Sequence, residues 1–182
     1  MNYIRNIHHR RSIRLQGYDY SQAGAYFITI CCDAKKCLFG GIVDGEMRLN
    51  EFGIIAYNEW VKLPGRFMNF ELDVFQIMPN HIHGVIVLNA SNQKSGAGVN
   101  PAPTVVTVGA IVGAYKSLVA KACLIVFESG YLKTGHTPPK MGKLWQRNYY
   151  EHIIRNEQSY QTIFDYIISN PNKWSDDSLY MP

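Results

Sequence analysis

The chain of 182 residues has few charged side chains, no long apolar run and few cysteines, and each shortage excludes a class of protein. Charged residues make up 18% of the chain and apolar residues 47%, a balance that excludes an intrinsically disordered or low-complexity protein. No run approaches the roughly 18 consecutive apolar residues of a membrane-spanning helix, so we expect no membrane partner. The basic N-terminus lacks the apolar segment of a secretory signal, so we expect a soluble cytoplasmic protein.

The four cysteines do not form a zinc-binding pattern. Cys31, Cys32, Cys37 and Cys123 include no CxxC pair, the spacing that is typical of zinc sites. Cys31 and Cys32 end an apolar segment, where free cysteine behaves as a small apolar side chain. A cytosolic location also argues against disulfides.

The net charge of +4 is unevenly distributed along the chain. Four arginines precede Asp19, the first acidic residue: Arg5, Arg10, Arg11 and Arg14. A solvated tail and an electrostatic arm for a phosphate backbone both have this composition. Charge alone does not decide between them.

The length suits one domain, and we expect residues 1–182 to form one. Within it we expect a basic N-terminal arm at 1–20. Two segments rich in glycine, proline, serine or asparagine predict flexible loops at 89–104 and 129–143.

Periodicity and turn signals predict an α+β fold. The apolar patterns favour strands at 25–32, 70–78 and 81–88, helices at 51–63, 106–126 and 157–170, an extended segment at 145–154, and a hairpin at 39–49 around Asp44-Gly45. Without the hairpin the core order is β-α-β-β-α-β, which is typical of a ferredoxin-like (split βαβ) antiparallel sheet. We expect two helices on one face, an open second face that can hold a site, and one additional C-terminal helix.

The segment Pro79-Asn80-His81-Ile82-His83-Gly84 is the sharpest local feature. Side chains alternate along a strand, so His81 and His83 point to the same face while Ile82 points into the core. Two neutral imidazoles side by side can ligate one metal ion, although two ligands are too few for a complete site. A half-exposed surface pair of histidines is the other interpretation.

The last helix offers further ligands. Its apolar arc predicts a buried stripe, and Tyr166 and Asn170 lie one turn apart at the border of that arc, where a side chain can reach a sheet face. Taken alone, Tyr166 fits an amphipathic residue at a helix rim. Asn170 equally fits a helix end before Pro171.

Together these segments resemble the single-tyrosine HUH transposases, and most closely the REP-associated tyrosine transposases. The resemblance rests on His81-Ile82-His83, on the segment WQRNYYEHIIRNE at 145–157, and on YIISNP at 166–171, in that order. It extends over nearly the whole chain. It implies an enzyme that cuts single-stranded DNA near hairpins through a 5′-phosphotyrosine intermediate and then rejoins the DNA.

The resemblance also implies roles for individual residues. His81 and His83 match the metal-binding pair, Tyr166 the nucleophile, and Asn170 the polar residue that completes the metal site. The implied ion is Mg²⁺ or Mn²⁺, and the implied partner is single-stranded DNA with a hairpin, bound by a monomer or a homodimer. Other tyrosines compete for the nucleophile's place, namely Tyr149, Tyr150 and Tyr160.

Basic and aromatic residues elsewhere are candidates for DNA contact. We expect phosphate contacts or base stacking from Arg10, Arg11, Arg14, Lys116, Lys121, Trp145, Arg147 and Arg155. For Trp145, ordinary packing explains the residue equally well.

Two other functions are compatible with these residues. A ferredoxin-like sheet with exposed aromatics can bind single strands without cutting them. A small metallohydrolase would use His81 and His83 with a carboxylate such as Glu151, and it would form no protein–DNA bond.

Overall fold

A computed structural model describes residues 19, 21–90 and 106–181. The strands are β1 (Gly24–Cys31), β2 (Gly40–Val43), β3 (Glu46–Leu49), β4 (Phe70–Ile77), β5 (His81–Leu88) and β6 (Tyr150–Ile154). The α-helices are α1 (Glu51–Val61), α2 (Val108–Lys133) and α3 (Glu157–Ser169), and short 3₁₀ helices cover η1 (Asp33–Lys35), η2 (Leu63–Gly65) and η3 (Pro171–Asp176). The expected arm at 1–20 and most of the expected loop at 89–104 lie outside the described residues.

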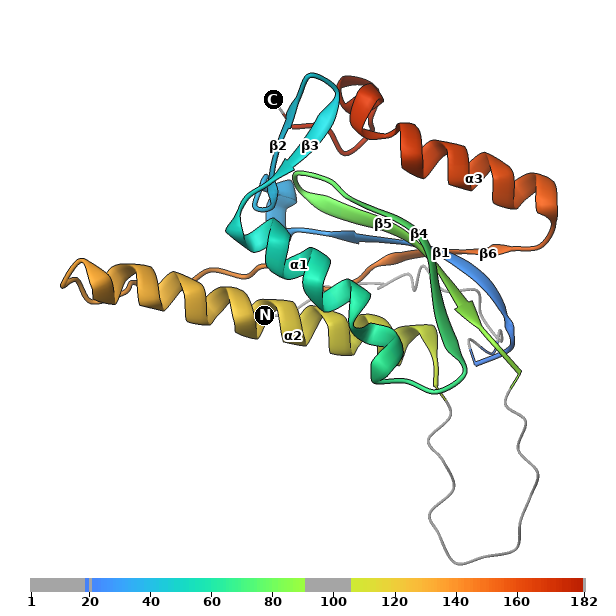
Figure 1. The fold of residues 1–182 in the computed structure, drawn as a ribbon, viewed down its shortest axis with the longest axis horizontal. Helices are drawn as coiled ribbons and strands as arrows, with labels where there is room; N and C mark the ends of the chain where they lie inside the picture. The colour runs from blue at the N-terminus through green and yellow to red at the C-terminus, as the bar shows by residue number, and fades with distance from the viewer. Residues whose placement is uncertain (1–18, 20, 91–105, 182) are drawn as a thin grey trace, which may run out of the picture.

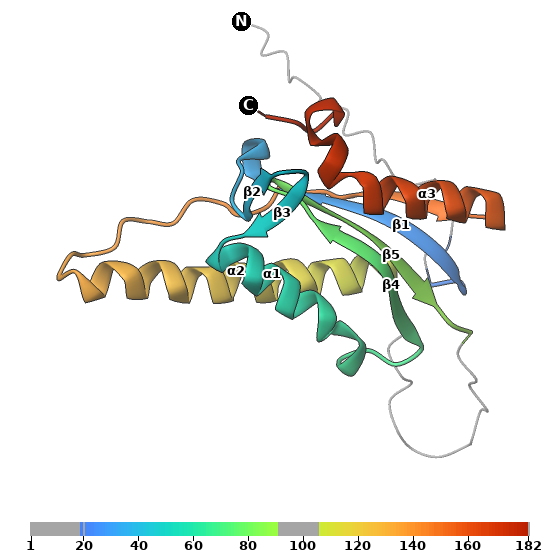
Figure 2. The same cartoon turned by 45° about the horizontal axis from the view of Figure 1, so that its top comes forward.

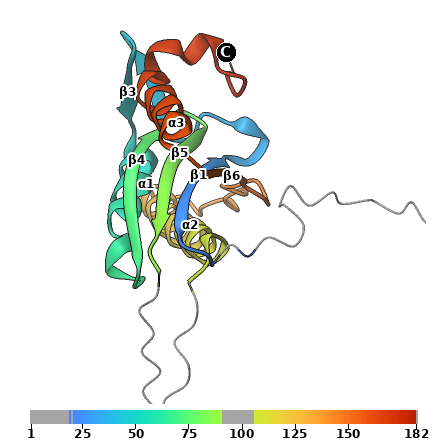
Figure 3. The same ribbon diagram turned by 90° about the vertical axis from the view of Figure 1, so that its right-hand side faces the viewer.

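The central sheet has the strand order β4-β5-β1-β6, and every neighbouring pair is antiparallel (Figure 3). Because β2 and β3 form a separate two-stranded sheet, the core order along the chain is β1-α1-β4-β5-α2-β6. The predicted split βαβ fold is therefore confirmed. The hairpin signal is also confirmed, because Asp44 and Gly45 both have positive φ angles, 53° and 75°, as a tight hairpin turn requires.

The two faces of the sheet carry different helices. Ile28 and Ile82 are fully buried on the face covered by α1 and α2, where the indole of Trp60 packs so closely over Gly84 that an added Cβ would lie 2.6 Å from it. Helix α3 lies across the opposite face (Figures 1 and 2). The face that the sequence left open is thus partly covered by the C-terminal helix, which brings α3 side chains against His81 and His83.

Side-chain caps fix the helix starts. The side chains of Asn50, Thr107 and Asn156 accept hydrogen bonds from backbone N–H groups in the first turns of α1, α2 and α3.

Helix α2 continues past residue 126, where the sequence predicted its end, and through the start of the expected loop at Ser129-Gly130. Phe127 and Tyr131 pack one turn apart there, with ring centroids 5.0 Å apart, and a single glycine is tolerated inside a helix. The helix ends at Lys133, before Gly135 with a positive φ of 74°, so the loop expected at 129–143 begins later than predicted.

Helix α2 is also long and apolar enough, by length and composition alone, to cross a membrane. A search for an uninterrupted apolar run does not detect this helix, because polar residues interrupt the segment although its mean hydropathy stays apolar. One face of α2, which includes Ile111, Tyr115 and Val119, is buried against the rest of the fold, while 28% of the apolar window as a whole is buried.

Candidate functional site

The two histidines of β5 lie side by side on the sheet face that α3 covers. Both are buried, with 0% exposure for His81 and 2% for His83, and their ring centroids are 4.3 Å apart. The alternation predicted for this strand explains the arrangement, since Ile82 between them is buried in the core on the other face. A half-exposed surface pair is therefore excluded.

Polar neighbours orient both rings. Nδ1 of His83 is 2.9 Å from the hydroxyl of Thr29, the residue opposite it on β1, and Nδ1 of His81 is 2.8 Å from the amide oxygen of Asn80. Asn80 is held in turn, because its Nδ2 group donates to the carbonyl oxygens of Lys35 and Leu179. Anchoring at Nδ1 leaves Nε2 of each ring as the atom available to the site, as in metal-binding histidines.

Tyr166 of α3 extends its hydroxyl to this histidine pair. The phenol oxygen is 3.1 Å from Nε2 of His83 and donates to Oδ2 of Asp177 at 3.2 Å. Phe27 of β1 packs against both groups, stacked on His83 at 5.4 Å and edge-on to Tyr166 at 6.2 Å. Tyr166 remains 41% exposed, so the hydroxyl is positioned and the ring is still accessible from solvent.

Asp177 is a site residue that the sequence did not reveal. It follows η3, which turns the chain back over the site after α3 (Figure 2), and its side chain is fully buried. The side-chain amide of Asn170 donates to Oδ2 of Asp177 at 2.6 Å, and Oδ1 of Asp177 accepts from the backbone N–H of Leu179 at 2.6 Å. Asp177 lies in no periodic element or motif, so the only sequence signal was an acidic pair soon after the YIISNP segment.

The ligand atoms of His81, His83 and Asp177 lie within 4.8 Å of one another, close enough to hold one metal ion. Two buried atoms beside them, Nε2 of His81 and Oδ1 of Asn170, have no hydrogen-bond partner among the described residues. Leaving such atoms unpaired costs roughly 1–3 kcal/mol each, and a cation would relieve that cost. The donor set of two imidazoles, a carboxylate and an amide oxygen therefore fits a divalent cation.

Burial sets the protonation of the site. Burial, followed by repulsion from His83, lowers the pKa of His81 to about 3, and burial also lowers the pKa of His83. Both imidazoles are therefore neutral near pH 7, which is the form that binds metals. Burial and then the negative charge of Asp177 raise the pKa of Tyr166 to about 12, so without a cation the hydroxyl stays a phenol.

Replacing Thr29 by valine should weaken metal binding without changing the fold. Valine has the shape of threonine and suits a strand, but it removes the hydroxyl that holds Nδ1 of His83. Loss of such an outer contact typically lowers metal affinity by roughly 10–100-fold. Titration calorimetry with Mn²⁺ measures this, with Thr134→Val beyond the end of α2 as the matched control; equal affinities for the two variants would contradict the orienting role.

The competing tyrosines lie elsewhere. Tyr160 donates to Asp73 on β4 at 2.7 Å, and Tyr149 packs against the core. Tyr150 pairs with Thr29, two strands from His83, which corresponds to roughly 10 Å at ~4.8 Å per strand. Tyr166 is thus the tyrosine whose hydroxyl is seen against a site histidine.

Glu151 cannot complete the histidine pair. It lies opposite Ile28 on β1, and directly paired residues share one face of a sheet. Ile28 belongs to the core beneath α1 and α2, so Glu151 and the histidines project from opposite faces. Glu151 is therefore not the carboxylate ligand of the metallohydrolase hypothesis, but Asp177 supplies a carboxylate beside the histidine pair, so the presence or absence of a protein–DNA bond must separate the two functions.

Two of the expected DNA-contacting residues are structural. Trp145 is 8% exposed, packs between Phe39 and Tyr115, and donates its indole N–H to the carbonyl of Lys116, so its ring is not available to stack on bases. The Lys116 ammonium contacts three successive backbone carbonyls, those of residues 146–148, at 2.5–3.5 Å. These contacts correct the expectation for the buried Trp145 and give Lys116 a structural role, because each residue holds the segment that leads into β6; a DNA contact by the half-buried Lys116 stays a prediction.

Replacing Lys116 by alanine should therefore destabilise the protein. The change leaves carbonyl groups of the segment at residues 146–148 without their donor, which we expect to lower the free energy of unfolding by roughly 1–3 kcal/mol. Lys121→Ala, an exposed change on the same helix, should shift it by no more than about 0.5 kcal/mol. Urea denaturation distinguishes the two, and equal stabilities would contradict the structural role of Lys116.

The remaining candidates are exposed or lie outside the described residues. Lys121, Arg147 and Arg155 are exposed. Arg10, Arg11 and Arg14 fall outside the described part of the chain.

Comparison with known proteins supports the fold. No known family model matches the chain. The chain is 40% identical over 187 residues to a Haemophilus influenzae protein described as uncharacterized, a match that covers 98% of this chain and 97% of that protein. A solved structure of a REP-associated tyrosine transposase bound to a REP hairpin matches with a TM-score of 0.58 and 18% identity, over 86% of this chain and 72% of that one. This likeness confirms the fold that the sequence motifs implied.

Proposed function

We propose that this chain, which belongs to the same family as the Haemophilus influenzae protein and has the fold of a REP-associated tyrosine transposase, cuts and rejoins single-stranded DNA near hairpins. One observation carries the proposal. The hydroxyl of Tyr166 lies 3.1 Å from Nε2 of His83, although 83 positions separate the two residues in the sequence. A phenol that is partly exposed and held against a buried histidine pair is suited to attack a phosphodiester.

The reaction forms one bond and breaks another. The oxygen of Tyr166 attacks phosphorus and forms a P–O bond, while the bond from phosphorus to the 3′-oxygen breaks and leaves a free 3′-hydroxyl. The phenol proton leaves toward Oδ2 of Asp177, which already accepts from the hydroxyl, or toward water at the exposed side of the ring, because Nε2 of His83 is the atom that would hold the cation. Because one phosphoester bond replaces another, a second 3′-hydroxyl can attack the phosphotyrosine and rejoin the DNA without an external energy source.

The site residues would hold a divalent cation, Mg²⁺ or Mn²⁺, through His81 and His83, with Asn170 and Asp177 as oxygen donors. When bound, such an ion supplies positive charge that polarises a phosphate oxygen. Thr29 and Asn80 orient the rings, and the neutral imidazoles are ready to bind without losing protons.

The proposed partner is single-stranded DNA with a hairpin. The solved transposase of the same fold is bound to a REP hairpin. The exposed Lys121, Arg147 and Arg155, together with the arginines at 10, 11 and 14, are the proposed phosphate contacts.

Labelled hairpin DNA with unpaired flanks and Mn²⁺ tests the proposal. A 5′-phosphotyrosine retains the fragment downstream of the cut, so DNA labelled at its 3′ end should remain attached to the full chain on a denaturing gel. DNA labelled at its 5′ end should be released as a shorter fragment. The opposite labelling pattern would contradict the proposed polarity.

The same gel separates the alternatives. A non-catalytic binding protein would leave the DNA intact although it retards the DNA under native conditions. A hydrolase would release both fragments without an adduct. Either result would contradict the proposed function.

A further inference from the structure

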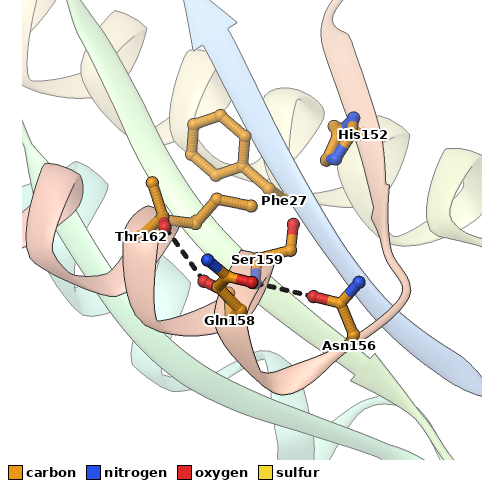
Figure 4. A pocket seen from close by; sticks show the side chains of 7 residues that line it. Phe27, His152, Asn156, Gln158, Ser159 and Thr162 are labelled. Carbon is orange, nitrogen blue, oxygen red and sulfur yellow. Dashed lines mark hydrogen bonds between the residues drawn. The ribbon is translucent and has the colours of Figure 1, made fainter.

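A hollow of about 520 Å³ lies beside the candidate site, between α3 and the strands β1 and β6 (Figure 4). Its volume falls within the roughly 300–1,000 Å³ of small-molecule pockets. Phe27 and His152 face it from the sheet, and Ser159 and Thr162 face it from the helix.

The hollow adjoins the candidate site in two places, along helix α3 and at Phe27 of β1. Ser159, Thr162 and Ile163 precede Tyr166 by seven, four and three positions, so they lie on the same stripe of α3 as the phenol. Phe27 lines the hollow and also contacts both His83 and Tyr166. A DNA strand whose phosphate meets Tyr166 therefore passes the mouth of the hollow.

The lining chemistry suits a nucleobase better than a phosphate. Phosphate sites generally use arginine or lysine, and neither residue lines the hollow. The lining instead combines the aromatic ring of Phe27 and the aliphatic Ile163 with two amides, from Asn156 and Gln158, and the hydroxyls of α3. Rings stack on bases, and amides and hydroxyls offer the donors and acceptors that distinguish base edges.

Hydrogen bonds to the backbone of α3 orient two of the polar side chains, those of Asn156 and Thr162. The amide oxygen of Asn156 accepts from the backbone N–H of Ser159 at 2.8 Å, and the hydroxyl of Thr162 donates to the carbonyl of Gln158 at 2.9 Å (Figure 4). These bonds hold the first turns of α3, so the hollow is formed before a ligand arrives. A preformed pocket binds without a further ordering cost.

We propose that this hollow binds one unpaired base next to the scissile phosphate, and so gives the cut a base preference of its own. The inference rests on the proposed function, since it concerns the strand that Tyr166 attacks. Leucine at position 159 would add apolar volume inside the hollow and replace a lining hydroxyl, whereas the same side chain at Gln161, which bonds to Asp165 on the exposed side of α3, would leave the hollow unchanged.

Hairpin oligonucleotides with randomised unpaired flanks test the proposal. The full chain is incubated with this pool and Mn²⁺, covalent adducts are isolated on a denaturing gel, and the attached and released fragments are sequenced. We expect a roughly tenfold preference for one base at a position adjoining the cut. Ser159→Leu should lose this preference, or lose adducts while still binding the hairpin, and Gln161→Leu should keep both.

The outcomes separate this inference from the function on which it rests. Wild-type adducts without any base preference next to the cut, or an unchanged preference in Ser159→Leu, would overturn the base pocket and leave the nuclease intact. Absence of all wild-type adducts would overturn both. Melting temperatures monitor folding, and Gln158→Ala, which removes an amide without adding volume, should weaken the preference if Ser159→Leu does not fold.

Discussion

Tyr166→Phe is expected to lower the rate of covalent adduct formation by on the order of 10³-fold or more, because it removes the only atom that can form the bond to phosphorus. The ring that packs against Phe27 remains. The lost contacts of the hydroxyl to His83 and Asp177 should cost only about 1 kcal/mol of stability. Time courses of adduct formation on denaturing gels measure the rate.

Tyr160→Phe is the matched control for this prediction. It removes a hydroxyl from the same helix and breaks one hydrogen bond, to Asp73, at a similar cost in stability. Adducts should form at nearly the wild-type rate in this variant, and also in Tyr149→Phe and Tyr150→Phe. A normal adduct yield in Tyr166→Phe would move the nucleophile to another residue.

His81→Ala is expected to reduce Mn²⁺ affinity by on the order of 100-fold or more and to remove cleavage with it. His81 is a better position than His83 for testing metal binding. Its Nε2 has no hydrogen-bond partner among the described residues, so its replacement leaves the contact between His83 and Tyr166 in place. Residues that only orient a metal ligand contribute roughly 10–100-fold to metal affinity, so we expect loss of the ligand itself to lower the affinity further. Calorimetry measures the affinity directly.

Thermal denaturation gives an independent measure of the same effect. A ligand that binds only the folded state raises its stability, so Mn²⁺ should raise the melting temperature of the wild type and of His136→Ala but not of His81→Ala. His136 is exposed beyond the end of α2, which makes it a suitable control. An equal rise in all three proteins would show that Mn²⁺ binds elsewhere.

Much of this fold follows from local patterns in the sequence. Strand alternation placed His81 and His83 on one face, the Asp44-Gly45 turn marked the hairpin, and two helices were expected to begin at residues 51 and 157, as they do. Each of these features depends on residues that are close together in the sequence, so a short segment is enough to predict it. The split βαβ order then follows from the sequence of elements.

Features that depend on distant contacts were not predictable. Asp177 reaches the histidines only because the chain turns at η3, after α3, and returns to the site. Lys116 and Trp145 resemble DNA-binding residues in the sequence, but they anchor the segment before β6 because backbone carbonyls and core aromatics surround them. The type of a side chain limits which groups it can contact, but the folded structure determines which of those groups lie close to it.

The central claim is that the Tyr166 phenol forms the covalent bond to DNA, and peptide mapping of the adduct tests it most directly. Trypsin, which cuts after lysine and arginine, separates residues 148–155, with Tyr149 and Tyr150, from residues 156–173, with Tyr160 and Tyr166. After nuclease trimming, fragmentation by mass spectrometry should locate the nucleotide mass on Tyr166. A nucleotide on Tyr149, Tyr150 or Tyr160 would contradict the account.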